Sequence, residues 1–195
     1  KLAANFYMNS LNILRQFAKE TKKAISTRIE LALLIVDIYF QLGMYKENIA
    51  LLEETMKLSE KNQFKEELAK CYYMLAKNYY FLGNQVAAMD FYYKVIPIAE
   101  ELKLDKLLAI PYCAIGRANC YIAKFDDSID YIQKGIAILP KDEEIEWIYS
   151  LGILAQSYAA VGLKREALNT ISRLLEDFPP YDYELKNNEN EIKEI

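Results

Sequence analysis

The 195-residue chain contains no histidine, only three cysteines, six glycines and five prolines. The absence of histidine excludes His-based metal sites, the Ser-His-Asp and Cys-His nucleophilic arrangements, and the side chain that most often moves protons near neutral pH. No apolar run approaches the ~20 residues that a membrane-spanning helix requires, so we expect no membrane partner. With few glycines and prolines, the chain has few positions at which a helix must end.

The three cysteines match neither a metal site nor a disulfide framework. Their number is odd, and no two have the CxxC spacing. Cys113 and Cys120 are seven residues apart, which on one helix is about 10 Å of rise and too far for a disulfide. We therefore expect reduced thiols, a cytoplasmic location, and no metal or other cofactor.

Acidic residues are concentrated in the last quarter of the chain. Residues 141–195 carry 6 basic and 12 acidic side chains, whereas residues 1–140 carry 18 and 16. This acidic balance argues against direct contact with nucleic acid. The acidic run 142–146 predicts a helix start, with Asp142 as the N-cap and glutamates in the first turn.

A helical pattern repeats along the chain with a period of about 40 residues. Apolar residues recur at i, i+3, i+4 and i+7 nearly throughout, which indicates amphipathic helices. Gly43, Gly83, Ala123 and Gly162 are 40, 40 and 39 residues apart. Each follows the end of one apolar-aromatic helix and precedes the start of another, so each repeat is predicted to be a helical hairpin.

The residues around these turns resemble tetratricopeptide repeats. That family places a large residue, a Leu-small pair and a Tyr in the first helix, and small and aromatic residues in the second. The second, third and fourth repeats share these positions, which are Tyr72, Leu75, Ala76, Tyr79, Ala88 and Tyr92; Tyr112, Ile115, Gly116, Phe125, Ser128 and Gly135; and Leu151, Leu154, Ala155, Tyr158 and Ala167. The first repeat departs from the pattern at Asn48 and Thr55.

The resemblance implies an all-α fold, in which antiparallel hairpins stack into a right-handed superhelical solenoid. Residues 1–26 are expected to supply the second helix of a truncated upstream repeat, and residues 27–180 four hairpins. Residues 181–195 are expected to form either a capping helix or a linker to a further domain. The long period is similar to that of bacterial maltose-type transcription activators, aspartate phosphatases, peptide-pheromone receptors and kinesin light chains.

In the family that this chain resembles, the first helix of each hairpin lines a concave groove that binds partner segments. The repeat register places a row of charged and polar residues there, which are Asp37, Lys77, Arg117 and Gln156. The predicted partner-binding residues are basic and aromatic: Lys70, Tyr73, Lys77, Phe81, Arg117 and Tyr121. Basic groups would attract a carboxylate or phosphate, and the rings offer apolar area at low entropic cost.

An alternative is that these are ordinary groove charges, neutralised by Asp37 and Glu30 across the repeat. Chaperone-adaptor members of the family bind a carboxylate with Lys, Asn and Arg on successive first helices. Here Glu30 and Asp37 stand where basic or amide groups would be needed. We therefore do not expect recognition of an EEVD-type C-terminal tail.

The resemblance implies a non-catalytic protein- or peptide-binding module of a larger cytoplasmic regulatory or signalling protein. No Gly-rich phosphate loop, HExxH or GxSxG motif is present, and no catalytic residue is assigned. Its partner is expected to be a protein or peptide, with an acidic group as one option. The alternative is a scaffold that forms a homodimer through its end repeats or docks an adjacent transcription-regulator, cyclase or kinase domain.

Two prolines lie where helices are predicted. Pro97 falls within the second helix of the second repeat, and Pro111 at the start of the next first helix. Because proline removes a backbone donor, we expect the second helix to bend or stop near Ile96, with an irregular connection over residues 98–110.

Overall fold

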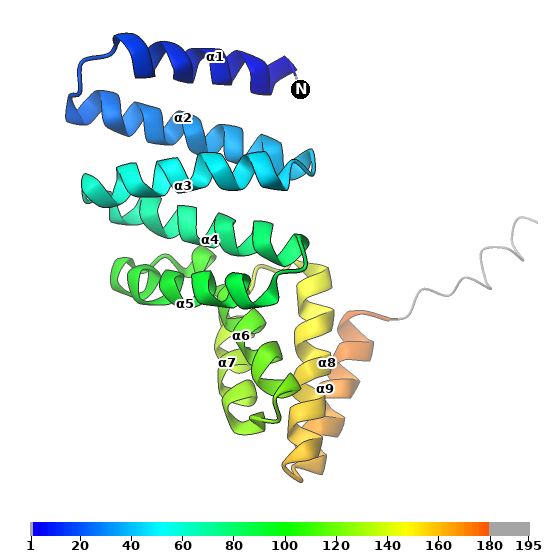
Figure 1. Cartoon of the computed structure of the whole chain (residues 1–195). Helices are drawn as coiled ribbons and strands as arrows, with labels where there is room; N and C mark the ends of the chain where they lie inside the picture. Colours follow the sequence, from blue (N-terminus) through cyan, green and yellow to red (C-terminus); the bar gives the residue numbers. More distant parts are fainter. Residues whose placement is uncertain (1, 180–195) are drawn as a thin grey trace, which may run out of the picture.

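The computed structural model describes residues 2–179, and within them the fold is entirely helical (Figure 1). The helices are α1 (Leu2–Phe17), α2 (Lys22–Gln41), α3 (Tyr45–Lys61), α4 (Lys65–Phe81), α5 (Gln85–Leu102), α6 (Ala109–Tyr121), α7 (Phe125–Ile138), α8 (Glu144–Ala160) and α9 (Lys164–Asp177), with a 3-10 turn at Asp105–Leu107. None of the helices in this part of the chain is long and apolar enough to cross a membrane.

Helices α2 to α9 form four antiparallel hairpins, and these stack into an α-solenoid as the repeat pattern predicts. In Figure 1, α1 to α5 lie across the view, whereas α6 to α9 run down it. The change of direction follows the 3-10 turn Asp105–Leu107 between the second and third hairpins. α2 begins at Lys22, so the boundary expected between residues 26 and 27 falls inside a helix. Residues 181–195, for which a cap or linker is expected, lie outside the described residues.

The turn inside each hairpin depends on one residue with left-handed backbone. Gly43, Gly83 and Gly162 have φ angles of 70°, 78° and 85°. Ala123 occupies the equivalent position with φ 59°, although it carries a Cβ. The alignment of this alanine with three glycines is therefore confirmed, and it identifies a position where glycine would relieve strain.

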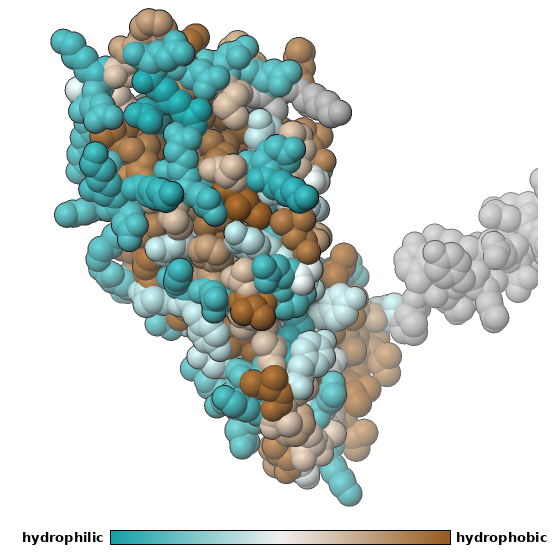
Figure 2. All heavy atoms as spheres, viewed as in Figure 1, coloured by the Kyte–Doolittle hydropathy of each residue, from teal (hydrophilic) through white to brown (hydrophobic). Residues whose placement is uncertain are grey.

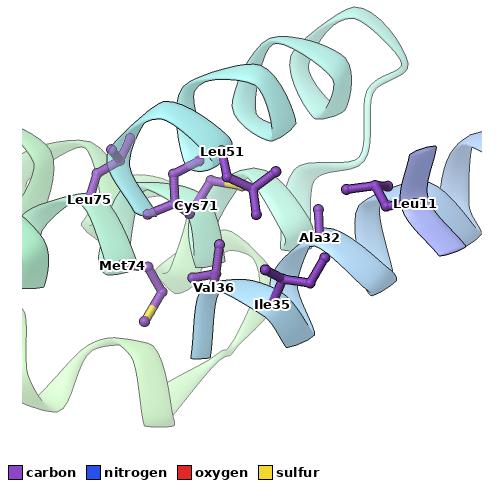
Figure 3. Packing of buried hydrophobic residues seen from close by; sticks show 9 residues of the cluster. Leu11, Ala32, Ile35, Val36, Leu51, Cys71, Met74 and Leu75 are labelled. Carbon is purple, nitrogen blue, oxygen red and sulfur yellow. The ribbon is translucent and has the colours of Figure 1, made fainter. Parts of the chain in front are cut away.

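A core of buried residues joins the first two hairpins to α1 (Figure 3). Ile35, Val36, Leu52 and Leu75 are fully buried there, and Leu11 of α1 is 2% exposed. Residues from α1, α2, α3 and α4 meet in this one cluster. The first helix of each hairpin thus packs against the second helix of the same hairpin and against the hairpin before it. Its apolar residues are therefore buried on two sides of the helix.

The two departures in the first repeat are accommodated by hydrogen bonds. Asn48 is fully buried on α3, and its Nδ2 donates to the carbonyl oxygen of Val36 at 2.9 Å. The Thr55 hydroxyl donates to the carbonyl oxygen of Leu51 at 2.7 Å. Asn48 therefore ties α3 to α2, because a buried donor is stabilising only when it is paired.

Of the two outcomes expected for the second helix of the second repeat, a bend or a stop near Ile96, the stop is wrong. α5 continues through Pro97 to Leu102. Pro97 and Tyr93 are both exposed, so the carbonyl of Tyr93, which loses its helical donor, lies on the solvent side of the helix. The irregular connection is residues 103–108 rather than 98–110. Pro111 lies in the first turn of α6, where a backbone N–H has no partner within the helix.

The acidic run before α8 marks a helix start, as predicted, but Asp142 is not its N-cap. Glu143 occupies that position, and its side chain forms no capping hydrogen bond. Glu144 and Glu146 lie in the first turn, where the partial positive charge of the helix terminus favours carboxylates.

Close approach of α6 and α7 requires two glycines. A Cβ built on Gly116 would lie 2.5 Å from the Ile132 side chain. A Cβ on Gly135 would lie 2.4 Å from Cys113 Sγ, 3.0 Å from the Cys113 nitrogen and 3.1 Å from the Ala109 carbonyl oxygen. Because two of these three atoms are backbone, the contact at Gly135 has little freedom to adjust.

We expect Gly135→Ala to lower the free energy of unfolding by about 1–3 kcal/mol, since the extra methyl must push α6 away. Gly152→Ala is the matched control, because a Cβ there meets no atom within 4 Å. That substitution should raise stability by up to about 1 kcal/mol through helix propensity. Urea denaturation of both variants measures the difference, and a loss of the same size in both would contradict the packing argument.

Candidate functional site

The first helices of the four hairpins are α2, α4, α6 and α8, and we call the surface that they form the first-helix surface. Part of the predicted groove comes together on it. Tyr73 and Lys77 lie one turn apart on α4, and the Lys77 Nζ atom is 5.5 Å from the centroid of the Tyr73 ring. The same Nζ is 4.6 Å from the centroid of Phe40 on α2. Lys77 therefore lies between two rings from neighbouring hairpins, a geometry in which the negative ring faces attract the ammonium group.

The charges around Lys77 are mixed rather than basic. Burial lowers the pKa of Lys77, and the carboxylates of Glu143 and Asp37 oppose that shift. Desolvation raises the pKa of Asp37, and Lys77 acts against it. Lys77 has no ion pair with a carboxylate anywhere in residues 2–179. It is thus a partly buried cation whose ammonium group contacts rings rather than an oxygen.

Arg117, the next basic residue of the predicted row, is already paired. Its guanidinium donates to Glu146 Oε1 of α8, and the two side chains are only 13% and 16% exposed. Burial lowers the pKa of Arg117, but the Glu146 carboxylate outweighs it, so the net shift is upward. This ion pair links the third hairpin to the fourth through their first helices.

The start of α8 reaches back to α4. The charges of Glu143 and Glu146 both act on Tyr73 and, after burial, raise the pKa of its hydroxyl. Figure 1 shows the upper end of α8 beside the turn between α4 and α5. Sequence reasoning missed these two glutamates as members of the site, because a first-turn acidic run is explained by the helix terminus alone.

Phe81 belongs to an aromatic triangle, which we define as Phe40, Tyr45 and Phe81. The three ring centroids are 5.3, 5.5 and 5.6 Å apart, with Tyr45 and Phe81 stacked and Phe40 edge-on to both. Phe81 is 55% exposed although its ring contacts two others. Phe40 and Tyr45 were not among the predicted site residues. The signal that could have found them is that they flank the turn of the first hairpin, and that Phe81 directly precedes the turn of the next.

Lys70 and Tyr121 lie apart from this group. Lys70 Nζ donates to Glu66 on the preceding turn of α4 at 2.6 Å. Both residues border an open depression against the connection 103–107. Tyr121 ends α6 and is 76% exposed. Glu30, one of the expected neutralising residues, instead accepts a hydrogen bond from Ser26.

The three cysteines are buried, and burial raises the pKa of Cys113 to about 11 and that of Cys71 to about 12. The Cys71 and Cys113 thiols are therefore protonated near neutral pH. No group of three metal-ligating side chains occurs in residues 2–179.

Residues 27–101, which hold all of α3 and α4 and most of α2 and α5, match the tetratricopeptide repeat model. These residues are tetratricopeptide repeats. The third and fourth hairpins, which the family match does not cover, have the same helix–turn–helix arrangement.

Solved structures of low sequence identity share the fold of the whole repeat array. BtubC (BKLC) from P. vanneervenii is 18% identical, with a TM-score of 0.69 over 90% of this chain and 71% of that one. A putative kinesin light chain from Podosopora anserina is also 18% identical, with a TM-score of 0.63 over 90% and 85%. The apo form of RapI is 14% identical, with a TM-score of 0.68 over 88% and 61%. No curated protein sequence matches the chain.

We expect Glu146→Gln to lower the free energy of unfolding by about 3 kcal/mol, because it leaves the Arg117 guanidinium buried without a counter-charge. The matched control is Asp130→Asn, which removes the carboxylate that pairs with Lys134 on the exposed face of α7. That change should cost less than about 1 kcal/mol. Urea denaturation measures the free energy of unfolding of both variants. Equal losses would show that the buried ion pair contributes no more to stability than the exposed one.

Proposed function

We propose that the chain is a non-catalytic protein-binding module of a larger cytoplasmic regulatory or signalling protein. Its first-helix surface would take a segment of a partner protein, in extended or helical form. The observation that supports this most is the combination of Lys77, held between two rings without a carboxylate ion pair, and the half-exposed Phe81 beside it. The tetratricopeptide repeats of residues 27–101 fit the same function.

An apolar side chain of the partner would bind against Phe81 and Tyr80. These adjacent rings are 55% and 43% exposed, with centroids 5.8 Å apart. Covering a ring of that size contributes about 1.5–3 kcal/mol. The Phe81 ring already contacts the other two rings of the aromatic triangle, so little side-chain entropy is lost when a partner binds.

One acidic group of the partner would reach Lys77. Lys70 and Arg117 already pair with Glu66 and Glu146, so they are not counted as its ligands. Asp37 and Glu143 lie near enough to act on Lys77, and they would repel a run of several carboxylates. The preferred segment therefore has one carboxylate next to an apolar residue, rather than an acidic tract.

A peptide library selected on the isolated chain tests this proposal, with Lys77→Met and Phe81→Ala as variants. Lys94→Met is a matched control, because Lys94 Nζ also lies over a ring, 4.9 Å from the centroid of Phe91, but on a second helix. Tyr93→Ala is the control for an exposed ring, since Tyr93 is 49% exposed on α5.

We expect Phe81→Ala to weaken the selected peptides about tenfold or more, as loss of a ring contact worth at least 1.4 kcal/mol requires. Lys77→Met should weaken only those peptides that contain an acidic residue. The two control variants should bind as the parent chain does. If the controls lose binding to the same extent, or if no variant loses it, the first-helix surface is not the binding site.

Self-association through the end repeats is a second candidate, and the outer face of α1 favours it. Leu2, Phe6 and Phe17 are 87%, 68% and 78% exposed on this one helix. If the candidate holds, sedimentation equilibrium should show a mass that rises with protein concentration, and Phe6→Asp should suppress that rise. A monomer at all concentrations would exclude self-association.

A further inference from the structure

Lys77 has carboxylates near it from two different hairpins. Asp37 lies on α2 of the first hairpin, and Glu143 directly precedes α8 of the fourth. In Figure 1, α4, which carries Lys77, lies between α2 and the upper end of α8. Burial lowers the pKa of Lys77, and the charges of Glu143 and Asp37 both act to raise it. We call these three residues, which come from three different hairpins, the acid–base–acid row.

The position of Glu143 is set by the ion pair one turn further along α8. Glu146 accepts a hydrogen bond from Arg117 of α6, and both side chains are mostly buried. Glu143 lies three residues earlier, about 4.5 Å back along the helix axis. After burial, the charge of Glu143 is the next cause that raises the pKa of Tyr73, one turn before Lys77 on α4. The start of α8 is therefore held where the Glu143 carboxylate faces α4.

The charges of the acid–base–acid row are not used within the fold. None of the three residues forms an ion pair in the part of the chain that the structure describes. The Glu143 side chain forms no capping hydrogen bond at the start of α8. Asp37 and Glu143 are exposed, and Lys77 is partly buried between two rings. The row is therefore open to charges that a partner brings.

The balance of the row is acidic, because it holds two carboxylates and one ammonium group. A partner carboxylate at Lys77 would gain one attraction and meet two repulsions. A basic group beside that carboxylate would add an attraction to Asp37 or Glu143 and offset the repulsion. Figure 2 shows hydrophilic and hydrophobic residues mixed around the upper end of α8 on the face in view, so one segment would meet both kinds.

We infer that the partner segment carries a basic residue beside its acidic one, and that Glu143 and Asp37 select for it. This inference rests on the proposed function, in which the acidic residue reaches Lys77. In an extended segment the two would be two residues apart, because side chains at i and i+2 lie on one side, about 7 Å apart. In a helical segment they would be three or four residues apart. The fourth hairpin thus contributes a specificity-determining residue to a surface of the first two.

A peptide library selected on the 195-residue chain tests the inference. Each peptide carries one Asp and one Leu at fixed positions, and Lys, Gln or Glu two residues to either side of the Asp. We expect Lys to be enriched over Gln about two- to fivefold, as an exposed ion pair allows. Glu143→Gln and Asp37→Asn should each lower this enrichment, and the double variant should abolish it. Glu143→Lys should reverse the preference, so that Glu is enriched over Lys at one position.

The matched control is Glu144→Gln. It removes the same charge from the start of the same helix, but Glu144 is not among the charges that act on Lys77 or Tyr73. The enrichment of Lys should be unchanged in this variant. Equal enrichment of Lys and Gln on the parent chain would overturn the inference. An equal loss in Glu144→Gln and Glu143→Gln would also overturn it, because the preference would then reflect only the acidity of the whole chain.

Phe81→Ala separates this inference from the proposed function. If Phe81→Ala weakens the peptides while the parent chain enriches Lys and Gln equally, the first-helix surface binds the partner and the charge selection is wrong. If Phe81→Ala, Lys77→Met and Glu143→Gln all leave binding unchanged, both the proposed function and this inference are wrong.

Discussion

The structure depends on one constraint: a helical hairpin cannot bury both of its apolar faces by itself. The inner face is closed between the two helices, and the outer face of the second helix must be closed by whatever follows. Leu52, Tyr92 and Ile132 show this being met three times, each at the same register position and each almost without exposure. Each hairpin in this chain is therefore stabilised by its neighbours. A hairpin at either end of the described array has a neighbour on one side only, whereas a hairpin in the middle has one on both sides.

The same constraint places the proposed partner surface on helices that also stabilise the array. The first helices join consecutive hairpins, and they also carry the candidate partner surface. Arg117 shows the consequence, since its pairing with Glu146 of the next first helix uses the charge that a ligand would need. Lys77 differs because its neighbours are rings, which attract the ammonium group without occupying it with a carboxylate. Arg117 thus serves to join two hairpins, whereas we propose that Lys77 is the basic residue of the row that contacts a partner.

Much of the fold was predictable because it is local and repeated. The turn positions Gly43, Gly83, Ala123 and Gly162 followed from spacing, and all four have left-handed backbone. Pro97 was misjudged because the cost of a proline depends on which side of the helix it lies, and a freed carbonyl on the solvent side can bond to water. Among the predicted groove residues, the side chains of Tyr73 and Lys77 are in contact. Lys70 instead pairs with Glu66, and Tyr121 is the last residue of α6. The triangle partner Phe40 and the counter-charge Glu146 were missed.

The sequence by itself determined the helical class, the four-hairpin division, the turn positions and the small residues between α6 and α7, because each depends on contacts within about one repeat. Only the tertiary structure decided which charges are neutralised. Glu146 is 29 residues from Arg117, and the charge of Glu143 acts on Lys77 of α4 in an array that changes direction after the second hairpin. That direction depends on how whole hairpins pack against one another, and periodicity within a helix carries no information about it.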